Sequence, residues 1–150
     1  MVTKLIAVFL MGTAVGALYR IPRNLLLYGS FTGVLVFIVA YTAVNRGSSP
    51  VLAAFLGAMT AGFVSVILAR LLRKPATIFV IPGFLPLVPG REAYTAMRFM
   101  VEGHYNQGVS MIMQTVLTGG AIAFGIFLST TIYRLLINYR LENTNYAGKG

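Results

Sequence analysis

The chain has 150 residues, of which 57% are hydrophobic and only 10% are charged, and its mean hydropathy is +0.81. Soluble domains carry about 25% charged residues, so this composition excludes a water-soluble fold and indicates helices that span lipid. The formal net charge of +9 does not indicate nucleic-acid binding, because the basic residues lie at the ends of apolar runs and form no cluster with exposed aromatic residues.

Three apolar runs open the chain. They cover about Val2 to Leu18, Leu25 to Val44 and Val51 to Leu72. Runs of this length fit a bilayer core of about 30 Å. A basic turn from Arg20 to Arg23 separates the first two runs, and turn-forming residues from Asn45 to Pro50 separate the second from the third.

Small residues recur at four-residue spacing within these runs, which allows helix backbones to approach closely. They are Gly12 and Gly16, Gly29 and Gly33, and Ala54, Ala58 and Gly62. The pattern predicts closely packed helices rather than isolated membrane anchors.

The fourth apolar run, about Ala76 to Pro89, is short and is interrupted by prolines. Pro82, Pro86 and Pro89 each remove a backbone donor and clash with the carbonyl four residues back, so a regular helix cannot run through all three. In lipid, the freed carbonyls survive only inside protein or beside a wet cavity, and many secondary transporters hold their substrate at such breaks. The run predicts a broken crossing helix or a re-entrant segment. The alternative is a kinked helix that serves packing alone.

A polar stretch from Glu92 to Gln107 follows, with apolar residues at three- and four-residue steps that predict a short amphipathic helix at the interface or on a partner. A fifth apolar run covers about Val109 to Ile137. We therefore expect an all-α, polytopic integral membrane protein with about five transmembrane helices, the fourth broken by prolines. Residues 1–137 form one transmembrane domain, and residues 138–150 form a polar C-terminal tail.

The distribution of Lys and Arg predicts the orientation. Five crossings with the N-terminus outside place more basic residues inside the cell than outside. The inner set is Arg20, Arg23, Arg70, Arg73, Lys74, Arg134, Arg140 and Lys149, and the outer set is Lys4, Arg46, Arg91 and Arg98. A re-entrant fourth segment weakens this bias. We expect the N-terminus outside and the C-terminus in the cytoplasm.

The segment around the break also carries a more specific pattern, in which a basic residue is followed by phenylalanine, three spaced prolines, a Pro-Gly pair and tyrosine. The residues are Arg73, Pro75, Phe79, Pro82, Pro86, Pro89, Gly90 and Tyr94. In this pattern the chain resembles the small, C-terminal-type membrane domain of the threonine/serine exporter family. The Ile21-Pro22-Arg23 loop with Gly29 and Gly33 fits the same family, and the resemblance covers about Leu5 to Leu136.

The resemblance implies a separate small subunit that works with a larger membrane subunit of the same family in the bacterial plasma membrane. It also implies export of small amino acids such as threonine and serine, or of related small carboxylates. Two alternatives remain: a non-transporting scaffold or assembly subunit, and a homo-oligomeric channel.

We expect the substrate site at the break. Arg91 could bind a carboxylate through two parallel hydrogen bonds, and Glu92, the only acid near the break, is a candidate proton carrier. The predicted substrate-binding residues are Arg91, Glu92, Tyr94, Thr95, Pro82, Pro86, Pro89, Gly90 and Arg23. The alternatives are a wetted surface for Arg91 and Glu92, and a topology anchor for Arg23. For Gln114 and Thr118, which lie one turn apart, we weigh bonds between helices against lining a path.

One histidine, three acids and no cysteine supply neither a catalytic constellation nor a usual metal site. No phosphate-binding glycine loop of the nucleotide-hydrolase kind is present. We therefore expect no enzyme activity, metal or cofactor, and transport that draws on an ion or substrate gradient.

Overall fold

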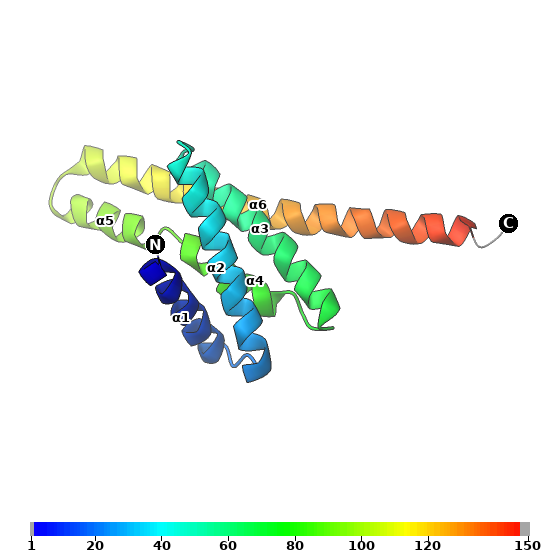
Figure 1. Ribbon diagram of the computed structural model, residues 1–150. Helices are drawn as coiled ribbons and strands as arrows, with labels where there is room; N and C mark the ends of the chain where they lie inside the picture. Colours follow the sequence, from blue (N-terminus) through cyan, green and yellow to red (C-terminus); the bar gives the residue numbers. More distant parts are fainter. Residues whose placement is uncertain (1, 148–150) are drawn as a thin grey trace.

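The structure is a computed structural model that describes the backbone of residues 2–147 and the side chains of residues 2–136. Within these residues every regular element is helical and no strand occurs (Figure 1). The elements are α1 (Val2–Leu18), α2 (Arg23–Asn45), α3 (Pro50–Leu71), α4 (Thr77–Phe84), the 3-10 helix η1 (Leu85–Leu87), α5 (Gly90–Val101) and α6 (Tyr105–Ala147). The all-α prediction is confirmed.

Among the described residues, three helices are long and apolar enough to cross a membrane. They are α2, α3 and residues Tyr105–Leu136 of α6, whereas α1 and the segment Thr77–Leu87 are apolar but shorter. Large hydrophobic side chains such as Leu35 and Phe127 lie exposed on these helices, as expected for a surface covered by lipid. The chain is a polytopic membrane protein, and whether it makes the predicted five crossings depends on whether α1 and the α4–η1 segment also cross.

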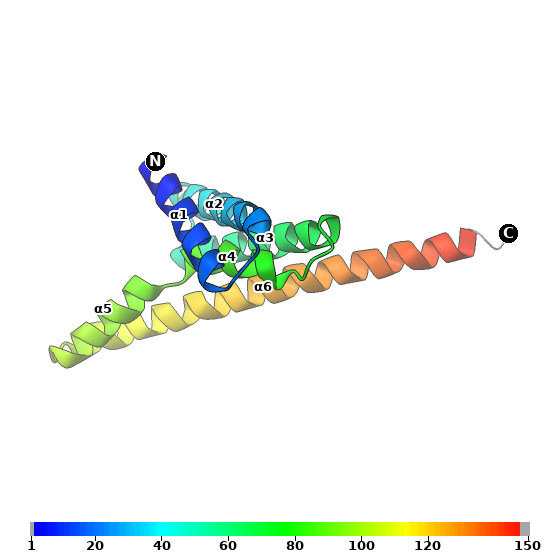
Figure 2. The same ribbon diagram turned by 90° about the horizontal axis from the view of Figure 1, so that it is seen from below.

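The broken segment lies in the middle of the helical bundle. Helix α4 packs against α1, α2 and α3, and α1 and α3 each pack along α2 (Figures 1 and 2). Phe79 and Pro82 of α4 are fully buried by these neighbours. A second contact joins α3 to α6 through Ala54, Ala58 and Ile122. Burial of this kind satisfies the condition under which a membrane protein can keep an irregular backbone.

Helices α5 and α6 form a hairpin that projects from the bundle, and α6 continues far beyond it on the other side (Figure 2). Its 43 residues correspond to about 65 Å at 1.5 Å per residue. An ion pair ends α5, where Arg98 Nε donates to Glu102 Oε1 at 2.7 Å. This hydrogen bond and the charge of Glu102 raise the pKa of Arg98 above its ordinary value.

Two predicted boundaries differ from the structure. The short amphipathic helix predicted within Glu92–Gln107 is α5, which ends at Val101, but α6 begins at Tyr105 rather than near Val109. The backbone of α6 continues as helix to Ala147, into the segment predicted as a polar tail. The side chains of residues 137–147, and residues 148–150 altogether, lie outside the described residues.

Candidate functional site

The three prolines of the fourth run act in different ways. Pro82 lies inside α4, Pro86 lies in the 3-10 turn η1, and Pro89 is the residue before α5. Between η1 and α5 the chain is extended at Val88, with φ −60° and ψ 124°. The prediction that no regular helix runs through all three prolines is confirmed, and the helix is broken at Val88 and Pro89.

The glycine pair of α2 faces the carbonyls that two of these prolines leave without a donor. A helix would bond the carbonyl of Ile78 to residue 82 and that of Pro82 to residue 86, but both partners lack an N–H. A Cβ added at Gly33 would lie 2.9 Å from the Pro82 oxygen, and one at Gly29 would lie 3.6 Å from the Ile78 oxygen. Both carbonyls therefore face the backbone of α2, where Cα–H groups are weak donors.

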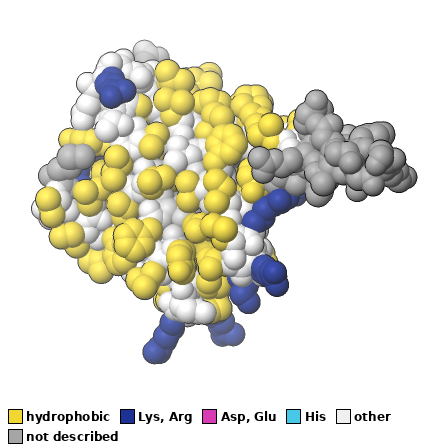
Figure 3. All heavy atoms as spheres, turned by 45° about the vertical axis from the view of Figure 1, so that its right-hand side comes forward, with side chains coloured by type: hydrophobic (Ala, Val, Ile, Leu, Met, Phe, Trp, Pro, Cys, Tyr) yellow, Lys and Arg dark blue, Asp and Glu magenta, His cyan; other side chains and the backbone are white. Residues whose placement is uncertain are grey.

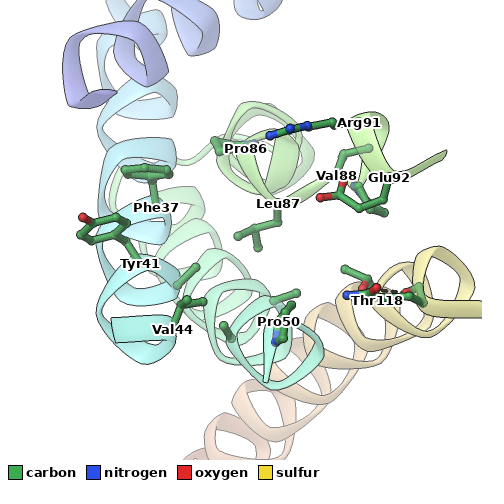
Figure 4. A pocket seen from close by; sticks show the side chains of 15 residues that line it. Phe37, Tyr41, Val44, Pro50, Pro86, Leu87, Val88, Arg91, Glu92 and Thr118 are labelled. Atoms are coloured by element: carbon green, nitrogen blue, oxygen red, sulfur yellow. Dashed lines mark hydrogen bonds between the residues drawn. The ribbon is translucent and has the colours of Figure 1, made fainter. Parts of the chain in front are cut away.

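A cavity of about 450 Å³ opens beside the break (Figure 4). Its wall is shared by η1 and the start of α5, the C-terminal half of α2, the first turn of α3, and α6. The lining residues are Phe37, Ala40, Tyr41, Val44, Pro50, Ala53, Ala54, Pro86, Leu87, Val88, Pro89, Arg91, Glu92, Gln114 and Thr118. Its volume falls within the range of small-molecule sites, and it exceeds the needs of one small amino acid, which leaves room for water.

The charged groups of the cavity come from the first turn of α5. Arg91 is exposed and Glu92 is half-buried. Figure 4 shows the Arg91 side chain reaching from α5 toward Pro86, with Glu92 beside Val88. Among the described side chains the only ion pair is that between Arg98 and Glu102, so Arg91 and Glu92 do not neutralise each other and both are available to a ligand.

Helix α6 adds polar groups to the opposite wall. Gln114 and Thr118 both line the cavity, one turn apart. The Thr118 hydroxyl donates to the Gln114 carbonyl at 2.8 Å, so its proton is used within the helix while its oxygen can still accept. Gln114 is exposed, and no hydrogen bond of its side-chain amide is found within the described part of the chain.

An aromatic pair of α2 forms the apolar side of the cavity. The rings of Phe37 and Tyr41 are stacked, with centroids 5.8 Å apart and an interplanar angle of 23°. The ammonium of Lys4, from the start of α1, lies 5.4 Å from the Tyr41 ring centroid, which is within cation–π range. Lys4 therefore contacts a residue of the cavity wall, whereas the charged residues that line the cavity itself are Arg91 and Glu92.

Four of the nine predicted site residues line the cavity: Pro86, Pro89, Arg91 and Glu92. The other five do not, for different reasons. Pro82 is buried against α2. Gly90 and Tyr94 are turned outward, with Tyr94 72% exposed.

Thr95 and Arg23 also lie away from the cavity. Thr95 is not among the residues that line the cavity, and its hydroxyl donates within α5 to the Arg91 carbonyl at 2.8 Å. Arg23 begins α2, fourteen residues or about 21 Å along the helix from Phe37. Sequence reasoning missed the aromatic pair, although its four-residue spacing was visible.

Among the described residues, no three His, Asp or Glu side chains gather in a way that could hold a metal ion.

Comparison with known proteins gives the following. The sequence model of a family described as "Threonine/Serine exporter, ThrE" matches residues 4–132. An uncharacterized protein of Haemophilus influenzae is 25% identical over 123 residues, which is 77% of this chain and 41% of that protein. A threonine/serine exporter of Corynebacterium glutamicum is 32% identical over 87 residues, which is 58% of this chain and 18% of that protein. The chain thus matches less than half of the length of either relative, and no solved structure matches.

Proposed function

Since the chain belongs to the threonine/serine exporter family, we propose that it is a membrane subunit of a secondary exporter, and that the cavity at the broken helix binds the substrate. One observation carries the proposal: the break at Val88 and Pro89 opens onto a cavity that also holds Arg91 and Glu92. We propose small amino acids like threonine and serine, or related small carboxylates, as the substrates.

The side chains of the cavity match the groups of such a substrate. Arg91 binds the carboxylate through two parallel hydrogen bonds, and Glu92 accepts from the ammonium or carries a coupled proton. Gln114 offers an amide to a substrate hydroxyl, and the Phe37–Tyr41 wall contacts its carbon atoms. Related carboxylates without an ammonium use Arg91 alone.

We propose that a larger membrane subunit of the same family completes the exporter. The exporter from Corynebacterium supports this, because the matched region is only 18% of that longer chain. The exposed apolar face of α6, with Val116, Leu117 and Phe124, offers a surface for such a subunit. The assembly lies in the bacterial plasma membrane, with the N-terminus of this chain outside.

Flux measurements in vesicles that contain both subunits test the site. Arg91→Ala should lower threonine efflux about tenfold or more, because a hydrogen bond to a charged group contributes roughly 1.5–3 kcal/mol. Glu92→Gln should abolish the dependence of efflux on the proton gradient. The matched control is Arg46→Ala, which removes an exposed cation outside the cavity wall and should leave efflux unchanged. Wild-type efflux in both site variants would reject the site and leave the family membership intact.

A further inference from the structure

Two turns at one end of the bundle hold arginine in a backbone conformation that favours glycine. Arg20 follows α1 with φ 54°, and Arg73 follows α3 with φ 52°. In both turns the next amide reaches back to the helix, from Ile21 to Gly16 and from Lys74 to Ala69, each at 2.9 Å. This is the Schellman helix ending, whose left-handed position is usually glycine. Something other than backbone stability therefore accounts for arginine at both places.

The two turns lie at the same end of the molecule. Helices α1, α2, α3 and α4 run alternately down and up the bundle (Figure 1), so the α1–α2 and α3–α4 turns share one end and the α2–α3 turn lies at the other. The guanidinium of Arg70 lies 5.2 Å from the Tyr133 ring centroid, which brings this part of α6 to the same end. We call this end the basic base; its exposed cations are Arg20, Arg23, Arg70, Arg73, Lys74 and Arg134.

No carboxylate compensates these charges among the side chains of residues 2–136. Of the two acids in that range, Glu92 lines the cavity and Glu102 pairs with Arg98. Figure 3 shows Lys and Arg side chains gathered below a belt of hydrophobic side chains, with no acidic side chain on that face. The basic base is therefore a positive surface directly adjoining the apolar one.

Large apolar side chains stand beside the two left-handed arginines. Leu18 is 80% exposed and Leu71 is 74% exposed, each two residues before its arginine. Exposed leucines are stable in the acyl region of a bilayer, and arginines two residues away then lie at headgroup level. Arginine binds phosphate oxygens in a bidentate manner, and the anionic lipids of a cytoplasmic leaflet attract basic residues at the surface.

We propose that the basic base is a binding surface for the phosphate headgroups of anionic phospholipids, with Arg20 and Arg73 as its two principal ligands. The inference goes beyond the proposed function, because it concerns a surface at the end away from the cavity and holds whatever the exporter carries. Lipid bound there fixes the end of α3 and the start of α4, the element that leads into the break.

The experiment measures binding of fluorescent phosphatidylglycerol and phosphatidylcholine to the purified full-length chain in neutral detergent at low salt. The wild type should prefer phosphatidylglycerol. Arg20→Gly with Arg73→Gly should lose about fivefold in affinity per arginine, which is the contribution of one basic residue near an anionic surface. Glycine suits both left-handed positions, so circular dichroism should show unchanged helix content and an equal or higher melting temperature.

Two controls separate charge from backbone and lipid from free phosphate. Arg20→Lys with Arg73→Lys keeps the charge and should retain the preference, and Lys4→Gln with Arg46→Gln, at the other end of the bundle, should not reduce it. Inorganic phosphate at the same concentration should not displace the lipid. Wild-type binding of phosphatidylglycerol by the double glycine variant, an equal loss in the Lys4 and Arg46 variant, or displacement by inorganic phosphate would each overturn the proposal. None of these outcomes depends on whether the cavity transports threonine.

Discussion

The close packing of α4 against α2 depends on individual glycine residues of α2. Gly33 lies where an added Cβ would be 2.9 Å from the Pro82 carbonyl oxygen, whereas nothing lies within 4 Å of one at Gly119 in α6. Because the Pro82 oxygen is backbone, it cannot yield as a flexible side chain would.

Gly33→Ala should therefore destabilise the folded protein by about 1–3 kcal/mol, the usual cost of overpacking. The same change at Gly119 should be neutral or stabilising by up to about 1 kcal/mol, because alanine favours the helix interior. Thermal unfolding in one detergent measures both. Equal melting temperatures for the two variants would show that α4 does not press on Gly33.

Ser65 is the one buried hydroxyl without a hydrogen-bond partner among the described side chains. Burying a polar group without a partner costs about 1–3 kcal/mol, so Ser65→Ala should raise the melting temperature or leave it unchanged. Ser30→Ala is the matched control, because the Ser30 hydroxyl donates to the Leu26 carbonyl at 3.0 Å and its removal brings no such gain. A lower melting temperature for Ser65→Ala would mean that this hydroxyl is bonded in the membrane.

The spacing of the glycines in α2 predicted close packing of helix backbones, but the sequence did not identify the element that packs against them. Two glycines four residues apart indicate that a backbone approaches, and they do not say which. The structure shows the broken helix there, with Pro82 and Pro86 at the same four-residue spacing along it. The sequence likewise placed the freed carbonyls inside protein or beside water, and only the packing decides that those of Ile78 and Pro82 face α2.

At the scale of the element, the break is the feature on which the proposed transport depends. Pro89 precedes α5 and follows the extended Val88, so restoring an N–H there favours a continuous helix and closes this wall of the cavity. Pro86→Ala and Pro89→Ala should each leave the two subunits co-purifying while efflux falls.

This experiment also separates the exporter from the scaffold alternative. A scaffold subunit predicts that the proline variants weaken the complex and that efflux falls only in proportion to the complex lost. Efflux at the wild-type rate from an intact complex of the Pro89→Ala variant would show that the break has no part in transport.

The boundaries around the α5–α6 hairpin illustrate what local sequence does not contain. The last apolar run was predicted to begin near Val109, yet α6 begins at Tyr105, within the polar stretch. The chain turns at Gly103, whose φ is 81°, and an added Cβ at Gly108 would lie 2.7 Å from Met100 Sδ. The close packing of α5 on α6 at Gly108 fixes where the second helix of the hairpin lies, and the preceding polar residues form its first turn.

At the scale of the whole molecule, the orientation can be tested cleanly because the chain contains no cysteine. Ser48→Cys lies in the α2–α3 turn and Tyr19→Cys in the α1–α2 turn, at opposite ends of the bundle. With the N-terminus outside, a membrane-impermeant thiol reagent applied to intact cells should label Ser48→Cys and not Tyr19→Cys. The reverse pattern would place the basic base outside the cell and contradict both the orientation and the lipid proposal.

The composition of the cavity shows the limit of sequence reasoning at this scale. Arg91 and Glu92 could be predicted because they adjoin the break in the chain itself. Phe37 and Tyr41 could not, since they lie about fifty residues earlier and meet the break only because α2 and η1 pack together. Gln114 was weighed between two roles, and only the position of α6 brings it to the cavity wall.

The central claim is that the cavity beside the helix break at Val88 contains water and binds a small polar substrate. The most direct test is the reaction of Val88→Cys with a water-soluble thiol reagent in vesicles, with Leu35→Cys on the lipid-facing side of α2 as control. We predict that Val88→Cys reacts, that Leu35→Cys does not, and that threonine, serine or a small carboxylate such as lactate slows the reaction. An unreactive Val88→Cys, or a reaction rate that none of these compounds changes, would contradict the account.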